Sequence, residues 1–454
     1  MESSLRQYLE KLHNSHRARF HMPGHKGRGE LPPFDAACPY DITEIAGADS
    51  LFEASGILAK GEEATAQIYG SKATLWSAGG STLCIQAMLG LTCREGDLIL
   101  AVRNAHHAFA HAAILLGVRV RWLLPQRQEQ GGLYGAVTAG EVEQALQEFP
   151  QAKGVWITTP DYLGGMADMK AIAEICHRRG VKLLVDNAHG AYLLYTHRHP
   201  MQLGADLCCD SPHKTLPVLT GGAWLHLSHQ VPYTPDQARQ AMKLFGSTSP
   251  SYLILLSLED CNRYLAGPGR EAFSRLFQTL TEMRRRLAAQ GVSLLPMEGD
   301  YAKLTLDALA MGYTGEEMTQ YLDAQGMDWE YADQQFVVLM LSPQNTETEL
   351  LALENALISL PKKKPLTQPE APYSLPPQRM ELRQGYFAPR EEVNLEQAVG
   401  RISAITQSCC PPGVPVVMPG EEITPQVCQL LKQSGKQRVE VVRQPPSPPE
   451  VPDR

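Results

Sequence analysis

Ser211-Pro212-His213-Lys214 is the stretch that decides how this 454-residue chain folds and acts. It follows the run Gly204–Cys209, and the glycine pair Gly221-Gly222 comes shortly after it. Upstream, the apolar run Val181–Val185 ends in Asp186. The chain therefore offers a carboxylate at the end of a predicted strand, and then a hydroxyl, an imidazole and an amine in close succession.

This set of groups suits pyridoxal phosphate (PLP). We predict that Lys214 forms the Schiff base, and that burial and nearby positive charge depress its pKa so that the neutral amine can attack an aldehyde. Asp186 is predicted to keep the pyridine nitrogen protonated, and Ser211 and His213 to hold the phosphate. Alone, Lys214 would be read as a surface lysine and Asp186 as a capping residue. Their combination favours the cofactor.

Short apolar runs separated by helical patterns predict an α/β fold with a mostly parallel sheet covered on both faces. One intervening helix has Asp168 as its N-cap and Gly180 as its stop. The predicted strands are Leu98–Val102, Val118–Leu124, Gly154–Thr159 and Val181–Val185.

Composition and turn residues divide the chain into six zones. We expect an N-terminal arm over 1–55, a large PLP-binding domain over 56–290, a small α/β domain over 291–362, a linker over 363–378, a C-terminal domain over 379–442 and a disordered tail over 443–454.

The bulk properties exclude several classes of function. A net charge of −8 and a pI near 6.0 give no field that would attract nucleic acid or an anionic membrane. Ten cysteines without a spacing framework indicate reduced thiols and a cytoplasmic protein. Met1–Phe20 lacks the apolar core of a signal peptide, and no apolar run approaches membrane-spanning length.

Three further motifs are candidates for the same site. Gly80, Ser81 and Thr82 precede a helical pattern, where free backbone N–H groups can hold a phosphate. Thr248 and Ser249 offer a second phosphate contact, supplied within the chain or to a neighbouring subunit. His106 follows a predicted strand and could stack on the pyridine ring. A metal site at His106, His107 and His111 is disfavoured because no carboxylate or cysteine stands at ligand spacing, so we predict no metal.

The chain resembles the Orn/Lys/Arg decarboxylases of PLP fold type I, in the short form of Gram-positive bacteria. The motifs that carry the resemblance run almost from end to end: His21-Met22-Pro23-Gly24-His25-Lys26-Gly27, Asp41-Ile42-Thr43-Glu44, Gly80-Ser81-Thr82, Arg103-Asn104-Ala105-His106, Asp186 with Ala188-His189-Gly190, Ser211 to Pro217, Thr248 to Tyr252, and Pro411-Pro412-Gly413-Val414-Pro415 with Pro419-Gly420-Glu421.

The resemblance implies that Lys214 carries PLP, that His106 stacks on the ring, that Asp186 binds its nitrogen and that His189 lies at the cofactor. It places four residues near the substrate: His25, Glu44, Asp49 and Glu421. It also implies a homodimer or a higher homo-oligomer with shared active sites. The chain departs from the family pattern at five positions: Gly79, Cys84, His107, Asn187 and Cys410.

We therefore expect decarboxylation of a small basic amino acid to an amine and carbon dioxide. Arginine, lysine and ornithine remain open as the substrate. The alternatives are a fold-type-I aminotransferase, or another PLP lyase, and a non-catalytic regulator with the same fold. An aminotransferase needs an arginine for the α-carboxylate, and Arg383 and Arg401 are the candidates.

Overall fold

The computed structural model describes residues 4–15, 17–124, 135–297, 299–367, 373–408 and 415–443. Of the predicted tail 443–454, only Arg443 is among the described residues. Cys410 and the motif residues 411–414 also lie outside them.

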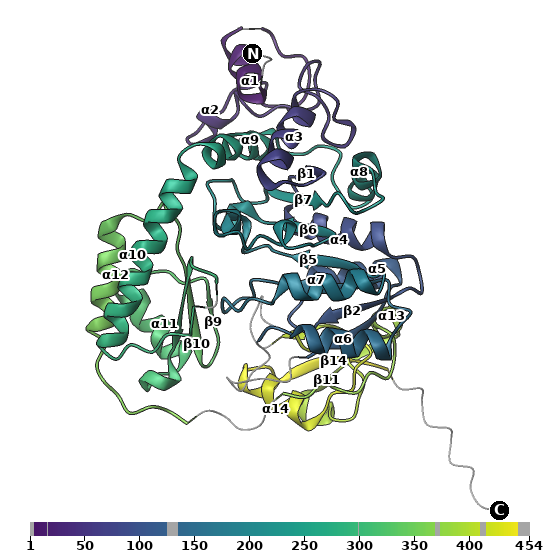
Figure 1. Cartoon of the computed structure of the whole chain (residues 1–454), viewed down its shortest axis with the longest axis vertical. Helices are drawn as coiled ribbons and strands as arrows, with labels where there is room; N and C mark the ends of the chain where they lie inside the picture. Colours follow the sequence, from purple (N-terminus) through teal and green to yellow (C-terminus); the bar gives the residue numbers. More distant parts are fainter. Residues whose placement is uncertain are drawn as a thin grey trace, which may run out of the picture.

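A seven-stranded sheet occupies the centre of the molecule, with the strand order β1-β7-β6-β5-β4-β2-β3 (Figure 1). Strands β3, β2, β4, β5 and β6 are parallel, whereas β7 is antiparallel to both β6 and β1. The predicted α/β class with a mostly parallel sheet is confirmed. The strands are β1 (Ala73–Ser77), β2 (Leu98–Val102), β3 (Arg119–Leu123), β4 (Gly154–Thr158), β5 (Lys182–Asp186), β6 (Leu207–Asp210) and β7 (Ala223–Leu227).

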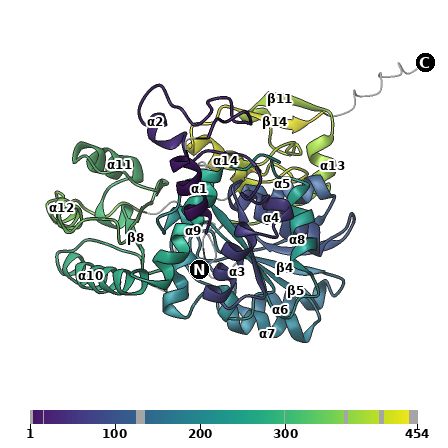
Figure 2. The same cartoon turned by 90° about the horizontal axis from the view of Figure 1, so that it is seen from above.

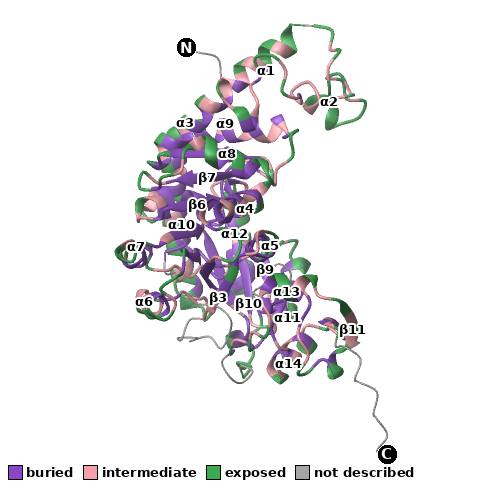
Figure 3. Cartoon of the chain, turned by 90° about the vertical axis from the view of Figure 1, so that its right-hand side faces the viewer, coloured by how far each residue is buried: buried purple, intermediate pink, exposed green. Residues whose placement is uncertain are grey.

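The central strands are mostly apolar because both faces of the sheet are buried, as Figure 3 shows. On β2, Ile99 and Ala101 belong to one hydrophobic core, whereas Leu100 and Val102 belong to the other. Helices α4 and α5 contribute to the first core, and α6 and α7 to the second. The helices of this part are α3 (Ile57–Tyr69), α4 (Gly80–Thr92), α5 (His107–Leu116), α6 (Ala139–Glu148), α7 (Met169–Arg178), α8 (Pro235–Lys243), α9 (Tyr252–Ala266) and α10 (Gly269–Ala289).

Helix α7 begins and ends where its sequence indicates. The Asp168 carboxylate accepts a hydrogen bond from the backbone N–H of Ala171 at 3.1 Å, which satisfies a free donor of the first turn. Gly180, just beyond the helix, has a φ of +68°, a conformation that costs glycine little. The predicted helix from Asp168 to Gly180 is confirmed.

A smaller three-stranded sheet, in the order β8-β10-β9, lies beside the large one (Figure 2). Helix α10 runs from the large part to this sheet and is held to α12 by the Arg286–Glu354 ion pair. The elements of this part are β8 (Lys303–Asp307), α11 (Gly315–Ala324), β9 (Tyr331–Ala332), β10 (Phe336–Met340) and α12 (Glu347–Ile358).

The last part of the chain folds back against the β2–β3 side of the large sheet (Figure 1). It contains two short antiparallel pairs, β11 with β14 and β12 with β13. Its elements are α13 (Leu382–Phe387), β11 (Arg390–Asn394), β12 (Gln407–Ser408), β13 (Pro415–Val417), α14 (Pro425–Gln433) and β14 (Arg438–Val442).

The N-terminal segment packs on the large part through α1 (Leu5–Asn14), and α2 (Phe34–Ala37) follows farther along the arm. Leu5 and Leu9 are fully buried. The Glu259 carboxylate on α9 accepts the backbone N–H groups of Leu5 and Arg6, both at 2.8 Å. Among the described residues, no helix is long and apolar enough to cross a membrane.

Candidate active site

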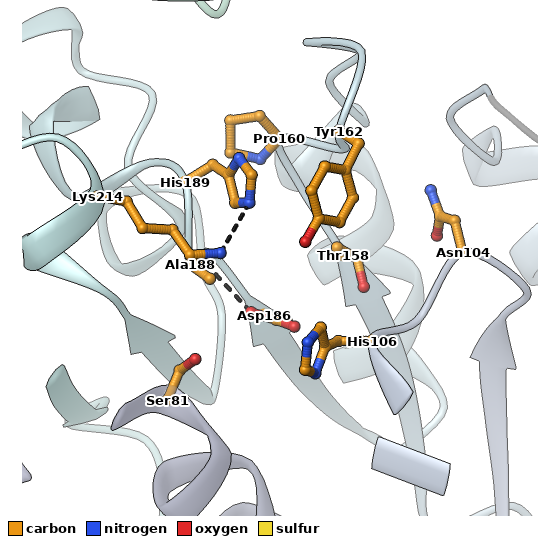
Figure 4. A pocket seen from close by; sticks show the side chains of 10 residues that line it. All are labelled: Ser81, Asn104, His106, Thr158, Pro160, Tyr162, Asp186, Ala188, His189 and Lys214. Atoms are coloured by element: carbon orange, nitrogen blue, oxygen red, sulfur yellow. Dashed lines mark hydrogen bonds between the residues drawn. The ribbon is translucent and has the colours of Figure 1, made fainter. Parts of the chain in front are cut away.

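A pocket lies at the carboxyl ends of β2, β4 and β5 (Figure 4). In a parallel sheet these ends meet at one edge, where α/β proteins commonly bind ligands. The pocket is lined by Ser81, Asn104, His106, Thr158, Pro160, Tyr162, Asp186, Ala188, His189 and Lys214. Five residues predicted for the cofactor site therefore converge here: Ser81, His106, Asp186, His189 and Lys214.

Lys214 projects into the pocket from the 3₁₀ turn Pro212–Lys214 (Figure 4). Its Nζ lies 2.9 Å from Nε2 of His189 and 5.9 Å from the centre of the Tyr162 ring. Burial lowers the pKa of Lys214, although the nearby Asp186 carboxylate opposes this effect. The environment therefore favours the neutral amine, which is the form that attacks an aldehyde.

Asp186 is the last residue of β5 and is only 2% exposed. Its Oδ1 accepts the backbone N–H of Ala188 at 3.2 Å and the Cys209 thiol at 3.7 Å. Burial raises the pKa of Asp186, and the positive charge of Lys214 opposes that rise. A second positive group in the pocket, such as a protonated pyridine nitrogen, would stabilise the carboxylate in the same way.

His106 is the N-cap of α5, and its Nδ1 accepts the backbone N–H of Ala108 at 3.2 Å. A proton on a neutral His106 ring must therefore sit on Nε2. Burial, followed by the charges of His107, Lys214 and His111, lowers the pKa of His106 to about 3. The ring is neutral at physiological pH and lines the pocket.

The side of the pocket next to α4 suits a phosphate. Ser81 lies in the first turn of this helix, where backbone N–H groups are free and the helix dipole is positive. Gly80 has a φ of +68° and brings the chain into that turn. One ring nitrogen of His213, Nδ1, lies 2.8 Å from the carbonyl oxygen of Gly222. Thr82 is exposed and does not line the pocket.

Several buried polar atoms around the pocket have no hydrogen-bond partner among the described residues. They are Oγ of Ser211, Oγ1 of Thr158, Oδ1 of Asn104 and Nδ1 of His189. Buried polar groups normally have partners, and a cluster without them indicates a polar ligand. PLP carries a phosphate, a phenolic oxygen and a ring nitrogen, so the residues present fit this cofactor.

Four residues that were predicted to contact the cofactor or the substrate lie outside this pocket. Thr248, Ser249 and Glu44 are exposed, and none lines the pocket. His25 lies on the N-terminal arm with its Nε2 3.1 Å from Oδ2 of Asp41, in a separate surface hollow.

Asp49 has a structural role that its sequence position did not reveal. Its carboxylate accepts the backbone N–H groups of Ser50 at 3.0 Å, Ser55 at 3.1 Å, Gly56 at 2.7 Å and Leu58 at 3.1 Å. These bonds fix the chain where α3 begins and lower the pKa of Asp49 against the effect of burial. A carboxylate with this many donors is poorly suited to receive a substrate cation.

Glu421 also differs from its predicted role near the substrate. It is 1% exposed, and both of its oxygens bind the Arg103 guanidinium, at 2.7 and 2.8 Å. Its charge is therefore neutralised within the protein. The two arginines considered as carboxylate clamps are engaged elsewhere too: Arg383 donates to the carbonyls of Ile114 and Leu115, and Arg401 pairs with Glu391.

A buried polar network stands behind the pocket. The rings of His199 and His226 both approach Oδ2 of Asp210, at 2.9 and 3.2 Å, and the Asn187 amide donates to Oδ1 at 2.6 Å. His199, Asp210 and Cys208 are close enough to serve as metal ligands. Both oxygens of Asp210 already have partners within the protein.

Tyr162 is a candidate from the sequence because it follows the predicted strand Gly154–Thr159, whereas Glu330 was not among the sequence candidates for the site. The Tyr162 ring lies 4.8 Å from that of His189 and 5.5 Å from that of Tyr331, a residue of β9. Glu330 directly precedes β9, and its negative charge counteracts the lowering of the Lys214 pKa. Tyr162 follows a predicted strand end, which is a usable signal, but no local pattern marks Glu330.

Comparison with protein families agrees with this geometry. Residues 3–302 match the model "Orn/Lys/Arg decarboxylase, major domain", and residues 375–440 match "Orn/Lys/Arg decarboxylase, C-terminal domain". The protein YaaO of Bacillus subtilis, named as uncharacterized, is 30% identical over 92% of this chain and 91% of its own length. An arginine decarboxylase of the same organism is 28% identical over 93% of this chain and 91% of its own.

Solved structures share the fold. The lysine decarboxylase LdcF of Francisella novicida superposes with a TM-score of 0.82 at 17% identity, covering 97% of this chain and 81% of its own. The constitutive lysine decarboxylase of Escherichia coli gives 0.78 at 19% identity, covering 97% and 82%. The family matches span the large part, with its pocket, and the C-terminal part, so this chain belongs to the Orn/Lys/Arg decarboxylase family and is a decarboxylase.

Proposed function

We propose that this protein removes the α-carboxylate of a basic amino acid with PLP bound at Lys214. The observation that carries the proposal is the pairing of Lys214, whose pKa burial lowers, with the buried carboxylate of Asp186 in one pocket. When bound, PLP supplies an electron sink for the carbon that loses carbon dioxide. Relatives with the name arginine decarboxylase favour arginine as the first substrate to test.

The residues of the pocket would then have distinct tasks. Asp186 would hold a proton on the ring nitrogen, and the neutral His106 ring would lie against the cofactor and fix its plane. Ser81, Ser211 and the free N–H groups of α4 would bind the phosphate. His189, whose Nε2 is 2.9 Å from Lys214 Nζ, would orient this amine and hold its proton.

Glu330 is the best-placed receptor for the cationic end of the substrate. Its carboxylate is exposed and makes no hydrogen bond or ion pair within the described parts of the chain. The backbone N–H of Glu330 bonds to the carbonyl of Val338 at 3.0 Å, and the next residue, Tyr331, packs on Tyr162 in the pocket. A guanidinium or ammonium entering the pocket would meet this carboxylate without displacing a protein partner.

We also propose that the chain acts in the cytoplasm as a homodimer or higher homo-oligomer. The eight cysteines that the structure describes are free thiols, which suits a reducing compartment. Thr248 and Ser249 are exposed in one chain, as residues that complete a neighbour's site would be.

To test this, the purified protein is loaded with PLP and incubated with arginine, lysine or ornithine in separate reactions. Carbon dioxide, amine and keto acid are measured in each reaction. We expect equimolar carbon dioxide and amine from one substrate, and none from the Lys214→Ala variant. Keto acid formed with an amino-group acceptor would instead support the aminotransferase alternative. A Lys214→Ala variant with wild-type turnover would refute the proposal.

A further inference from the structure

Arg103, directly after β2, is fully buried, and its guanidinium binds groups of the C-terminal part. Nη1 and Nη2 donate to the two oxygens of Glu421 at 2.7 and 2.8 Å, and Nε donates to the carbonyl of Pro415 at 3.0 Å. The Trp122 ring centre lies 5.2 Å from the guanidinium carbon. A desolvated guanidinium needs a compensating charge, so Glu421 is the partner that permits its burial.

Glu421 is itself held firmly in place. Its Oε2 also accepts the backbone N–H of Met418 at 2.8 Å. The Tyr373 hydroxyl donates to the carbonyl of Val416 at 2.7 Å and lies 3.4 Å from Nη2 of Arg103. A planar guanidinium bound at two oxygens has a fixed orientation, which a single lysine contact would not impose.

The segment that Arg103 begins leads directly into the pocket. Asn104 and His106 line the pocket, and His106 caps α5. The Arg103 N–H bonds to the carbonyl of Leu123 at 2.9 Å, and the Ala105 N–H bonds to that of Val102 at 3.1 Å. A shift of the Arg103 side chain would therefore be passed to the His106 ring through a short, tightly bonded loop.

We infer that Glu421 is a positioning residue: through Arg103 it fixes the loop that places the His106 ring in the cofactor pocket. This inference rests on the proposed function, because His106 matters in this way only if PLP binds beside it. The C-terminal part thus contributes to the site although Glu421 does not line the pocket.

The test compares Glu421→Gln and Glu421→Asp with the neighbouring control Glu422→Gln. Glu422 pairs with Arg379 at 2.7 Å on the surface of the same part of the chain. For each purified protein loaded with PLP, one measures the circular dichroism of the cofactor band, the Kd for PLP, kcat and KM. A purely structural residue would change the melting temperature but not the cofactor signal of the folded protein.

We expect both Glu421 variants to reduce the cofactor dichroism and to lower kcat by about ten- to a hundredfold, with KM changed by less than about threefold. The control should match the wild type. Wild-type dichroism and kcat in either folded Glu421 variant would overturn the inference, and Glu421→Asp decides if Glu421→Gln does not fold. Failure of the proposed function is a separate result, since the wild type itself would then show neither a cofactor band nor turnover.

Discussion

His106 should remain neutral when the pH falls well below the value at which a histidine normally gains its proton. Two features act together: burial, which has the larger effect, and the nearby positive charges of His107, Lys214 and His111. They lower the pKa to about 3. The ordinary value is about 6.5.

The size of the effect follows from that shift. At pH 5, a group with a pKa of 3 is about 1% protonated, whereas one with a pKa of 6.5 is about 97% protonated. The difference between a pKa of about 3 and one of about 6.5 corresponds to about 5 kcal/mol against charging the ring. Because the pKa of His106 is lowered on folding, its contribution to stability is present above about pH 6.5 and is lost as the pH falls towards 3.

The assay is a pH titration of the cofactor-free protein with ¹³C-labelled histidine rings, followed by NMR between pH 8 and pH 5. The His106→Asn variant identifies the resonance by its loss, and asparagine can still cap α5. We expect the His106 signal not to shift over this range. A His106 signal with a midpoint near 6.5 would refute the reasoning about burial and nearby charge.

Three other substitutions test separate parts of the site. Glu330→Gln should raise KM for the basic amino acid by about tenfold or more, with little change in kcat. The control Asp328→Asn, at a nearby exposed residue, should leave KM unchanged. A Glu330→Gln variant with the wild-type KM would show that Glu330 is not the receptor. In denaturant titrations, Glu421→Leu should lower the free energy of unfolding by about 3–5 kcal/mol, because it leaves the Arg103 charge buried without a partner. Adding Arg103→Met should restore most of the lost stability. A double variant no more stable than Glu421→Leu would argue against the ion pair as the cause. Ser211→Ala should raise the Kd for PLP by about tenfold but leave the melting temperature of the cofactor-free protein unchanged, because the hydroxyl has no partner among the described residues.

The large sheet could be predicted because its signals are local. The runs that became β2, β4 and β5 are mostly apolar, since both faces of the sheet are buried, and each ends at or near polar residues. Asp168 caps the first turn of α7, and Gly180 ends the helix with a positive φ. Both roles depend only on the neighbouring backbone, so the sequence alone could indicate them. Because parallel strands end at one edge, Asp186 and His106 could be expected to converge.

Long-range pairing could not be predicted in the same way. Glu421 follows a conspicuous turn motif, but Arg103 lies far from it in the sequence, and only the folded chain shows that the two charges neutralise each other. Asp49 likewise has no local signal for the four N–H groups that it accepts across a loop. Glu330 reaches the neighbourhood of the pocket only because the small sheet packs beside the large one.

The central claim is that Lys214 is the residue to which PLP attaches. Borohydride reduces the imine bond between an aldehyde and a lysine to a stable amine, so treatment of the PLP-loaded protein followed by peptide mass spectrometry identifies the lysine directly. We expect the pyridoxyl mass on the peptide that contains Lys214, and no such adduct in the Lys214→Ala variant. An adduct on another buried lysine, such as Lys303, or no adduct in the wild type, would contradict the assignment of the site.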